Sequence, residues 1–343
     1  AGLASPNPLV GCVVTDPDGE VVGEGTFEYE RVTHAEAIAL EQAGERARGG
    51  TAYVSLEPHS YHGRTPPCTE ALIAAGIARV VCPIEDPNPR VSGRGFEALR
   101  AAGIEVETGL LAEEALRLNE KFCVWHNFGR PFVHLKLAMS LDGRISLTNS
   151  VSTTLSGNES AARVQAIRHE HDAILVGGTT AFVDDPSLTD RSGKRRRRPL
   201  VRVILDNGLR IPIGSKLVRT ARETPTLVVS CSKDESKIVE LRNLGVDIER
   251  ADSRDLGQVM KALRERELQS VLVEGGSAVA GAFLDAKLVD KVTLIIAPLL
   301  IGGTAAPTAF AGSGAETLAD AMRLSQVEIT RHGPDIELTG YPE

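Results

Sequence analysis

The sequence contains no apolar run long enough to span a membrane, so we expect no transmembrane segment and no membrane partner. Its first residues, AGLASPNPLVG, lack the basic stretch and the following apolar stretch of a secretory signal. The cysteines are odd in number and scattered, which argues against a disulfide framework and favours a reducing compartment; they are Cys12, Cys68, Cys82, Cys123 and Cys231. We therefore expect a cytoplasmic protein.

The sequence also lacks an excess of basic residues. Its formal net charge is −8 and its isoelectric point is about 5.6, whereas binding to a phosphate backbone requires a basic face. We therefore expect no nucleic-acid partner. One basic run, from Lys194 to Arg198, stands out. It is interpreted either as a solvent-exposed loop between two elements or as a binding site for a cofactor phosphate.

Hydrophobic residues make up 42% and charged residues 24% of the chain, a balance typical of globular proteins rather than of disordered or fibrous ones. A length of 343 residues is too great for one ordinary core and fits two domains. The rhythm of the elements is interrupted near residues 120–130. We therefore predict a front domain over residues 1–123 and a rear domain over residues 130–343.

Both predicted domains alternate short apolar runs with helical patterns, which indicates an α/β class with layered sheets and helices. In the front domain we expect strands at 9–15, 21–25, 52–56 and 79–84, and helices at 34–42, 69–75, 96–102 and 113–119. In the rear domain we expect strands at 131–137, 173–176, 201–205, 226–230, 270–273 and 291–296, and helices at 161–169, 237–244, 256–267 and 278–284.

A candidate metal site lies in the front domain. His34-Ala-Glu36 stands at a predicted helix start, and Gly63-Arg-Thr-Pro-Pro-Cys68 leads into the next helix. A zinc deaminase needs three protein ligands, an open position for water, and a glutamate off the metal that carries protons. Histidine, cysteine and glutamate at helix starts supply those groups.

Four segments in order resemble the deaminase half of the bifunctional deaminase/reductase family of riboflavin biosynthesis. They are Pro6-Asn-Pro-Leu-Val-Gly-Cys12, His34-Ala-Glu36, Gly63-Arg-Thr-Pro-Pro-Cys68 and Asp86-Pro-Asn-Pro89. The resemblance implies a cytidine-deaminase-like fold, with His34 and Cys68 as zinc ligands and Glu36 as the catalytic proton shuttle. It also implies that Asn7 faces the pyrimidine. Nucleoside and tRNA deaminases share such domains, but the acidic chain and the long second domain disfavour them.

The sequence departs from the family pattern around the metal. His59 stands where the family has its first cysteine ligand, Tyr61 where a histidine is usual, and Phe27 in place of another histidine. One interpretation is that His59 binds zinc, since a His₂Cys set is chemically sensible. A second is that the site has decayed and the domain is a scaffold. A third is that His34 caps a helix and Cys68 is a buried apolar residue.

The rear domain contains a candidate dinucleotide site. Val273-Glu-Gly-Gly-Ser-Ala-Val-Ala-Gly281 is a strand that ends in a glycine turn and opens a helix. N–H groups at a helix start can hold a pyrophosphate, and glycines allow its close approach. The spacing is not that of the Rossmann fingerprint, and glycine turns also serve as simple connections. Arg168 and Arg191 are candidates for a paired phosphate clamp, with surface solvation as the alternative.

From about Pro131 onward, the sequence resembles the reductase half of the same family, which is similar in fold to dihydrofolate reductase. The resemblance assigns substrate binding to Ser152, Arg168, Leu188, Arg191 and Glu274. It assigns NADPH binding to Ala138, Thr154, Thr180, Asp184, Asn207, Gly276, Ser277, Ala278, Val279, Ala280, Gly281 and Ala282. Thr154 stands where a tryptophan is common, and Lys136 and Asp142 are expected near the site of hydride transfer.

The resemblance implies NADPH-dependent reduction of 5-amino-6-(5-phosphoribosylamino)uracil, a phosphorylated ribosylamino-pyrimidine, to its ribitylamino product. Zinc-dependent deamination of the diaminopyrimidine precursor would come first, and a homo-oligomer is expected. One alternative keeps only the reductase and makes the front domain a structural module. Another, from a different class, is a nucleotide-binding protein without enzymatic activity.

Overall fold

The computed structural model describes residues 4–29, 32–63, 65–148, 151 and 153–343. The chain divides between Gly129 and Arg130 into two compact units, each with its own sheet and hydrophobic core. In the described residues, no helix combines the length and the apolar character needed to cross a membrane.

The N-terminal unit is built on a five-stranded sheet in the order β2-β1-β3-β4-β5. β1 pairs antiparallel with β2 and β3, whereas β3, β4 and β5 are parallel. The strands are β1 (Gly11–Thr15), β2 (Val21–Thr26), β3 (Thr51–Val54), β4 (Arg79–Cys82) and β5 (Glu105–Thr108). The helices are α1 (Ala35–Ala43), α2 (Cys68–Ala74), α3 (Arg94–Ala101), α4 (Ala112–Leu118) and α5 (Glu120–Asn127), with the 3₁₀ helix η1 (Gly44–Ala47) after α1.

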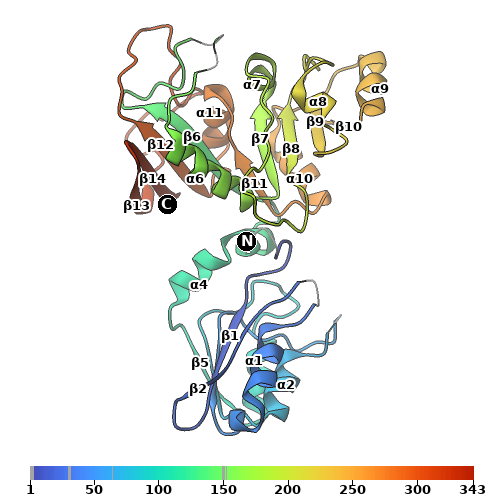
Figure 1. Cartoon of the computed structure of the whole chain (residues 1–343), viewed down its shortest axis with the longest axis vertical. Coiled ribbons are helices and arrows are strands. Elements are labelled where there is room, and N and C mark those ends of the chain that lie inside the picture. The colour runs from blue at the N-terminus through green and yellow to red at the C-terminus, as the bar shows by residue number, and fades with distance from the viewer. Residues whose placement is uncertain (1–3, 30–31, 64, 149–150, 152) are drawn as a thin grey trace. The chain divides into compact units, whose positions relative to one another are not determined.

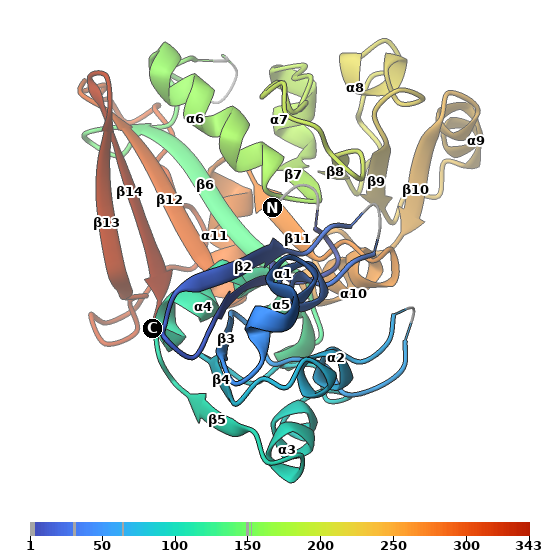
Figure 2. The same ribbon diagram turned by 60° about the horizontal axis from the view of Figure 1, so that its bottom comes forward.

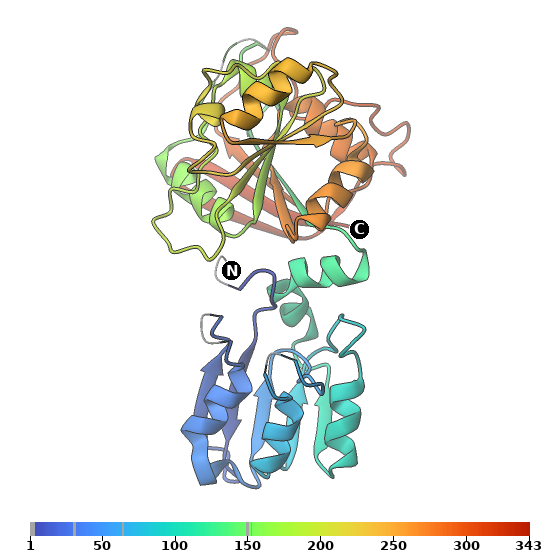
Figure 3. The same cartoon turned by 90° about the vertical axis from the view of Figure 1, so that its right-hand side faces the viewer.

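Helix α1 lies unusually close to strand β2. A Cβ atom added to Gly25 would come within 2.1 Å of the carbonyl oxygen of Ala35, so only glycine fits at this strand position. Ala35 and Ala39 present small buried side chains on the same helix. Figure 3 shows α1, α2 and α3 side by side on one face of the sheet. This packing fixes the start of α1, where two of the predicted functional residues lie.

The C-terminal unit is built on a nine-stranded sheet in the order β10-β9-β8-β7-β11-β6-β12-β14-β13 (Figure 1, Figure 2). The strands from β10 to β12 in this order are parallel to one another. Strand β14 pairs antiparallel with β12 on one side and with β13 on the other. The strands are β6 (Phe132–Ser140), β7 (Ala173–Gly177), β8 (Val201–Leu205), β9 (Thr226–Ser230), β10 (Val246–Arg250), β11 (Ser270–Val273), β12 (Lys291–Ala297), β13 (Leu324–His332) and β14 (Asp335–Pro342). The helices are α6 (Asn158–His169), α7 (Gly178–Val183), α8 (Lys216–Arg219), α9 (Glu235–Asn243), α10 (Leu256–Glu265) and α11 (Ser277–Asp285).

Strand β7 shows why the parallel strands are apolar throughout. Ala173 and Leu175 belong to one hydrophobic core, and Ile174 and Val176 belong to a second core on the other face of the sheet. Side chains alternate between the faces of a strand, so a sheet covered on both faces requires apolar residues at every position. The carboxyl ends of β7 and β11 share one edge of the sheet, and α7 and α11 therefore begin near each other.

The expected α/β class is confirmed in both units. The elements β5, β10, α7, α8 and the final pair β13 and β14 were not predicted from the sequence. The stretch interpreted as an interruption forms α5, and this helix belongs to the N-terminal unit.

Candidate functional site

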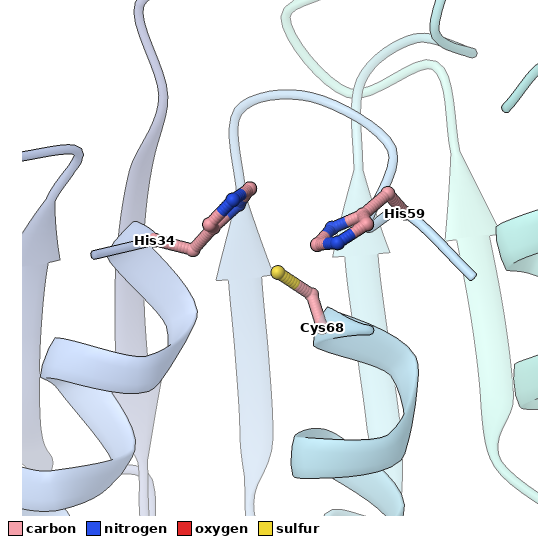
Figure 4. Close-up of side chains that lie close together, drawn as sticks. All are labelled: His34, His59 and Cys68. Atoms are coloured by element: carbon pink, nitrogen blue, oxygen red, sulfur yellow. The ribbon is translucent and has the colours of Figure 1, made fainter. Parts of the chain in front are cut away.

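The side chains predicted to bind a metal come together in the N-terminal unit. One potential ligand atom from each of His34, His59 and Cys68 lies within 4.8 Å of the others. Figure 4 shows their positions: His34 directly precedes α1, Cys68 is the first residue of α2, and His59 lies on the loop between β3 and α2. The side chain of His34 makes no capping hydrogen bond to α1, which argues against a helix-cap role for this residue.

The loop that carries His59 is anchored to the start of α2. The carbonyl oxygen of His59 accepts a hydrogen bond of 3.3 Å from the backbone N–H of Thr69. Pro67 precedes the helix, a position where a missing N–H donor does no harm. These local constraints place His59 and Cys68 on the same side of the helix start.

Glu57, which was not predicted from the sequence, links this loop to the segment that leads into α3. Its buried carboxylate accepts backbone N–H bonds from Asp86, Gly93 and Gly95 at 3.0, 3.0 and 2.8 Å, and a weaker one from Phe96 at 3.4 Å. The donors surround the N-terminus of α3, where a negative charge is stabilised. A buried glutamate directly before Pro58-His59 was the available signal in the sequence.

The electrostatics of the cluster suit a cation with neutral imidazole ligands. Burial lowers the pKa of His34, and burial together with the charges of His34 and His62 lowers the pKa of His59 to about 4. Burial raises the pKa of the Cys68 thiol, and the negative charge of the nearby Glu36 carboxylate raises it further. A buried thiolate therefore needs a positive partner, which a zinc ion provides. Two imidazoles and one thiolate are ordinary zinc ligands, so the donor set fits the metal.

Glu36 lies in α1 beside the cluster and is 2% exposed. Its Oε2 atom has no hydrogen-bond partner among the described residues. Burial raises the pKa of this carboxyl, although hydrogen bonds from its own backbone and from Cys68 oppose the shift. A buried carboxyl with a raised pKa and an unused oxygen can accept and return a proton.

Phe27 and Tyr61 stand at positions where the family usually has histidines. Their aromatic rings pack against His34 and His59. The Phe27 ring lies edge-on to His34 at 5.4 Å between centroids, and the Tyr61 ring lies edge-on to His59 at 5.3 Å. The imidazoles of His34 and His59 are stacked at 4.5 Å. These departures from the family pattern therefore pack against the ligands without removing a donor atom from the cluster.

Asn7, the residue expected to face the pyrimidine, lies in the segment before β1. Its backbone N–H donates a hydrogen bond of 2.7 Å to the carbonyl oxygen of Ala4. Within the described residues, its side chain makes no hydrogen bond to the metal cluster, and its role stays a prediction.

The C-terminal unit contains a cavity of about 1030 Å³ at the carboxyl ends of its parallel strands. The cavity is lined by the starts of α7 and α11, by the loops that follow β8 and β10, and by parts of the segments 145–153 and 307–311. Two helix N-termini therefore open into one space, an arrangement that suits an anionic ligand.

Most of the predicted cofactor residues lie in this lining. They are Thr180, Asp184, Asn207, Gly276, Ser277, Ala278, Val279 and Ala282. Ala138, Thr154, Ala280 and Gly281 lie outside the described lining. Ala280 is fully buried, and a Cβ atom on Gly281 would lie 1.3 Å from the carbonyl oxygen of Ala311. These two residues pack α11 against a neighbouring loop.

The backbone around the cavity is shaped by glycines. A Cβ atom on Gly275 would lie 2.6 Å from the side chain of Val279, and one on Gly178 would lie 3.0 Å from Asp206. The buried Asp206 lines the cavity, and its Oδ1 atom has no hydrogen-bond partner among the described residues. Close backbone approach and an unused acceptor fit a dinucleotide with its pyrophosphate and ribose hydroxyls.

Three charged side chains meet beside the glycine turn. Arg168 donates two hydrogen bonds of 2.8 Å to the two carboxylate oxygens of Glu274, and the Lys136 ammonium lies 3.9 Å from the same carboxylate. The side chains of all three are at most 12% exposed. Arg168 also donates to the carbonyl oxygen of Thr189, next to the predicted substrate residue Leu188.

The three charges shift one another's pKa values. Burial alone would raise the pKa of Glu274, but the charges of Lys136 and Arg168 outweigh it and lower the pKa. Burial lowers the pKa of Lys136, an effect that Glu274 opposes. A network with perturbed charges at a strand end is typical of a functional site.

The paired-arginine clamp stays a prediction. Arg168 is ion-paired with Glu274, whereas Arg191 is exposed and its backbone N–H donates a hydrogen bond to the side chain of Gln165. Leu188 is buried with a φ of 47°. Ser152 lies outside the described residues.

Asp142 is tied to Ser140 and to the loop over residues 301–302 rather than to the Lys136 network. It accepts hydrogen bonds from Ser140 and from the backbone N–H groups of Ile301 and Gly302 at 2.5, 3.1 and 2.7 Å. These bonds lower the pKa of Asp142 to about 2, the Ser140 bond most strongly. The residue therefore shapes the loop over residues 301–302.

The basic run is a structural clasp rather than part of the cavity. Arg196 donates to the carbonyl oxygens of Arg168 and His169 at 3.2 and 2.9 Å and to the Asp190 carboxylate at 3.0 Å. Arg198 donates to the carbonyl oxygen of Glu267 at 2.8 Å. None of the residues 194–198 belongs to the described lining of the large cavity, so the cavity gives no support to the cofactor-phosphate interpretation of this run.

Two family models match the chain. Residues 131–338 match the RibD C-terminal domain, and residues 1–84 match the cytidine and deoxycytidylate deaminase zinc-binding region. The first match covers the C-terminal unit with its cavity. The second covers the metal cluster.

Relatives similar over most of their length include the riboflavin biosynthesis protein RibD of Actinobacillus pleuropneumoniae. It is 41% identical over 98% of this chain and 90% of the relative. The protein of the same name from Escherichia coli (strain K12) is 40% identical over 96% of this chain and 92% of the relative.

Solved structures agree with these similarities. Acinetobacter baumannii RibD superposes with a TM-score of 0.86 at 35% identity, covering 99% of this chain and 94% of the other. A diaminohydroxyphosphoribosylaminopyrimidine deaminase/5-amino-6-(5-phosphoribosylamino)uracil reductase from Thermotoga maritima gives 0.85 at 34% identity, covering 100% and 94%.

Proposed function

The chain belongs to the RibD family of bifunctional deaminase/reductases of riboflavin biosynthesis, and we propose that its two units hold one active site each. The deaminase site is assigned to the domain over residues 1–123 and the reductase site to the domain over residues 130–343. The metal cluster of His34, His59 and Cys68 is the observation that carries the two-site assignment, because it argues against a merely structural front domain. Family membership favours two activities over the reductase-only alternative.

The substrate class is a phosphoribosylaminopyrimidine. The Thermotoga maritima relative is named as a deaminase of the diaminohydroxy compound and a reductase of 5-amino-6-(5-phosphoribosylamino)uracil. We assign both steps to this chain, deamination first and NADPH-dependent reduction second.

In the deaminase site, His34, His59 and Cys68 are assigned as the zinc ligands. A bound zinc ion supplies the positive charge that makes water acidic enough to attack the ring carbon at neutral pH. Deamination replaces the amino group of that carbon by the oxygen of water and releases ammonia. One proton must therefore travel from the attacking water to the departing nitrogen. Glu36 carries it, because its buried carboxyl has an unused oxygen and a raised pKa.

In the reductase site, C1′ of the ring-opened ribosylamino group gains a hydride and the neighbouring nitrogen gains a proton. NADPH supplies the hydride when it is bound. The helix N-termini of α7 and α11 hold the pyrophosphate of the dinucleotide, and the glycines allow its close approach. The Arg168–Glu274–Lys136 network anchors the polar part of the substrate. Substrate binding by Asn7, Ser152, Leu188 and Arg191 is part of the same proposal.

A homo-oligomer is proposed on the basis of strand β13. This edge strand is nine residues long, and its Val327 and Ile329 side chains are 46% and 69% exposed. Long exposed edge strands with apolar residues favour pairing with another chain. Sedimentation equilibrium of the wild type and of Ile329→Lys tests this, with dissociation expected only for the variant.

Cytoplasmic localisation is proposed from the cysteines. All five, Cys12, Cys68, Cys82, Cys123 and Cys231, are free. Free thiols are typical of a reducing compartment. Fractionation of cells that express the full gene tests this assignment.

The test of the two-site assignment measures each activity separately on the purified full chain. We expect about one zinc per chain, ammonia release from the diaminopyrimidine, and NADPH oxidation with the phosphoribosylamino-uracil. Glu36→Gln should lower deamination by roughly 10²–10⁴-fold and leave zinc content and NADPH oxidation unchanged. Glu41→Gln, an exposed change on the same helix, is the matched control. Ammonia release by Glu36→Gln at the wild-type rate would contradict the assignment.

A further inference from the structure

One end of the large cavity contains basic side chains that no predicted role uses. Among the described residues of the lining, Arg210 and Arg254 are the only basic ones. Arg210 lies on the loop after β8, and Arg254 lies on the loop after β10. In the sheet, β7 separates β8 and β10 from β11, the strand that leads to Glu274. Figure 1 shows β8, β9 and β10 on the side of β7 away from β6. The arginines therefore mark the end of the cavity remote from the substrate network.

Asn207 fixes the two loops relative to each other. Its Oδ1 atom accepts the backbone N–H of Ser253 at 2.8 Å, and its Nδ2 atom donates to Asp252 at 2.6 Å. The backbone N–H of Arg254 donates to the same Asp252 carboxylate at 2.9 Å. Both polar atoms of the Asn207 amide therefore form hydrogen bonds within the protein. Through these bonds Asn207 positions the loop of Arg254.

Asp206 adds an acceptor beside Arg210. Its Oδ2 atom accepts the backbone N–H of Ile211 at 2.8 Å, while its Oδ1 atom lacks a hydrogen bond and lies 3.7 Å from Nε of Arg210. The Asp206 side chain is 1% exposed, so the unmet acceptor is not satisfied by bulk water. A ligand hydroxyl at this end of the cavity would satisfy it.

The two guanidinium groups at this end supply donors for a dianion next to a hydroxyl. The Arg210 side chain is 64% exposed with a distant carboxylate contact, and Arg254 forms no ion pair within the described residues. Asp206 and Asp252 supply negative charge nearby, but their other contacts hold them against the loop backbone. Two guanidinium groups can bind one phosphate through charge-assisted bonds, and the aspartate can accept from a neighbouring hydroxyl.

We propose that Arg210 and Arg254 bind the 2′-phosphate of the adenosine ribose, that Asp206 accepts a hydrogen bond from a ribose hydroxyl beside it, and that this end of the cavity makes the reductase prefer NADPH to NADH. The inference rests on the proposed cofactor site and deepens it. The two helix N-termini hold the pyrophosphate in the middle of the cavity, and the substrate network lies beyond β11. The adenosine half therefore extends toward β8 and β10.

The test measures equilibrium binding by titration calorimetry on the full chain, with NADPH, NADH and 2′,5′-ADP as the probes. Arg210→Ala and Arg254→Ala should each weaken NADPH and 2′,5′-ADP by roughly 10- to 100-fold and change NADH by less than about twofold. Lys261→Ala, which removes one positive charge from the exposed face of α10, is the matched control and should change none of the three affinities.

Asp206→Asn separates the hydroxyl contact from the phosphate contact. NADPH and NADH share ribose hydroxyls, so this variant should weaken the binding of both. The amide oxygen can still accept the N–H of Ile211, which preserves the loop. A melting temperature near that of the wild type confirms that the variant is folded.

Three results would overturn the inference. They are unchanged NADPH binding in the Arg210→Ala/Arg254→Ala double variant, equal losses of NADPH and NADH in that variant, and a wild type that binds the two dinucleotides equally well. A wild type that binds neither dinucleotide would instead overturn the cofactor site itself, and with it everything inferred from it.

Discussion

The two candidate sites are built in different ways. In the N-terminal unit the chemistry depends on a few side chains, with ligand atoms from His34, His59 and Cys68 within 4.8 Å of one another. In the C-terminal unit a cavity of about 1030 Å³ is lined largely by loops and helix starts from many segments. A metal site loses its function when one of its ligands is removed, whereas a dinucleotide site distributes binding over many weak contacts. A single substitution at a ligand should therefore abolish activity in the N-terminal unit, whereas a single substitution in the cavity should only reduce activity in the C-terminal unit.

Cys68→Ser should produce the largest effect. Serine provides a poor zinc ligand in place of a thiolate, so zinc content should fall from about one equivalent to a small fraction. Deamination should fall below detection, while NADPH oxidation with the uracil substrate should stay within about twofold of the wild type. Metal analysis and the two activity assays measure these changes.

Cys231→Ser is the control, because Cys231 is an exposed free cysteine of the other unit. It should leave both activities unchanged. Full zinc content in Cys68→Ser would show that Cys68 is not a ligand.

Glu274→Gln should produce the next largest effect, and in the other unit. The amide keeps the shape of the carboxylate but leaves Arg168 and Lys136 without a negative partner in a site where the side chains are at most 12% exposed. Breaking a buried ion pair in this way costs about 3–5 kcal/mol of stability. Denaturant unfolding followed by circular dichroism should show the loss, together with weaker substrate binding.

Glu240→Gln, an exposed change on α9, should alter neither property. A Glu274→Gln variant with wild-type stability would mean that the three charges are better solvated than their burial indicates.

The same contrast explains how much the sequence could predict. The metal cluster was predictable because its residues carry the chemistry in their own side chains, at helix starts that the pattern also marks: His34 before α1 and Cys68 at the start of α2. The glycine turn before α11 was predictable because its glycines stand between a strand pattern and a helix pattern. Asp206, Arg210 and Arg254 were not, because nothing local distinguishes them. Arg254 lines the same cavity as Asp206 and Arg210 only because β8 and β10 lie on the same sheet with β9 between them.

The missed elements have a similar cause. Strand β13 has no buried residue in the described structure, and its register with β14 shifts between Ser325 and Glu328, so its apolar alternation is short. Strand β10 buries only Val246 and Ile248. Helix α7 is six residues long and begins with glycine, which disfavours helices in isolation. In each case tertiary packing, rather than local preference, determines the structure.

Two aspartates should respond to acid in opposite directions. Burial, with some repulsion from Glu57, raises the pKa of Asp86 from 3.8 to about 6. Asp86 therefore binds a proton more readily in the folded N-terminal unit than in the unfolded chain, and its own contribution to stability should rise as the pH falls from 6 toward 4. In the C-terminal unit, bonds from Ser192, His169 and Arg196 outweigh burial and lower the pKa of Asp190 to about 2. Its contribution is present above about pH 4 and is lost as the pH falls toward 2.

Calorimetric melting from pH 7 to pH 3 measures both trends. Asp86→Asn should remove the contribution of Asp86 in the N-terminal unit, and Asp190→Asn should remove the acid sensitivity that Asp190 adds to the C-terminal unit. Each difference from the wild type should amount to a few degrees in Tm. Differences between variant and wild type that change with pH in the same direction for both substitutions would contradict the assigned environments.

His59→Cys should produce the smallest effect and tests whether the departure from the family pattern matters. The substitution replaces a neutral imidazole with a thiol in a site where burial already raises the pKa of Cys68 and Glu36. Without metal the variant should be no more stable than the wild type, because a second buried thiol gains no partner. With zinc it should be stabilised more, because a second thiolate adds negative charge to the ligand set. Zinc affinity, measured by competition with a chelator, should rise, and deamination should change by no more than about tenfold. His59→Ala is the paired control and should lose zinc. If the alanine variant keeps zinc as firmly as the wild type, His59 is a bystander and the cluster needs another third ligand.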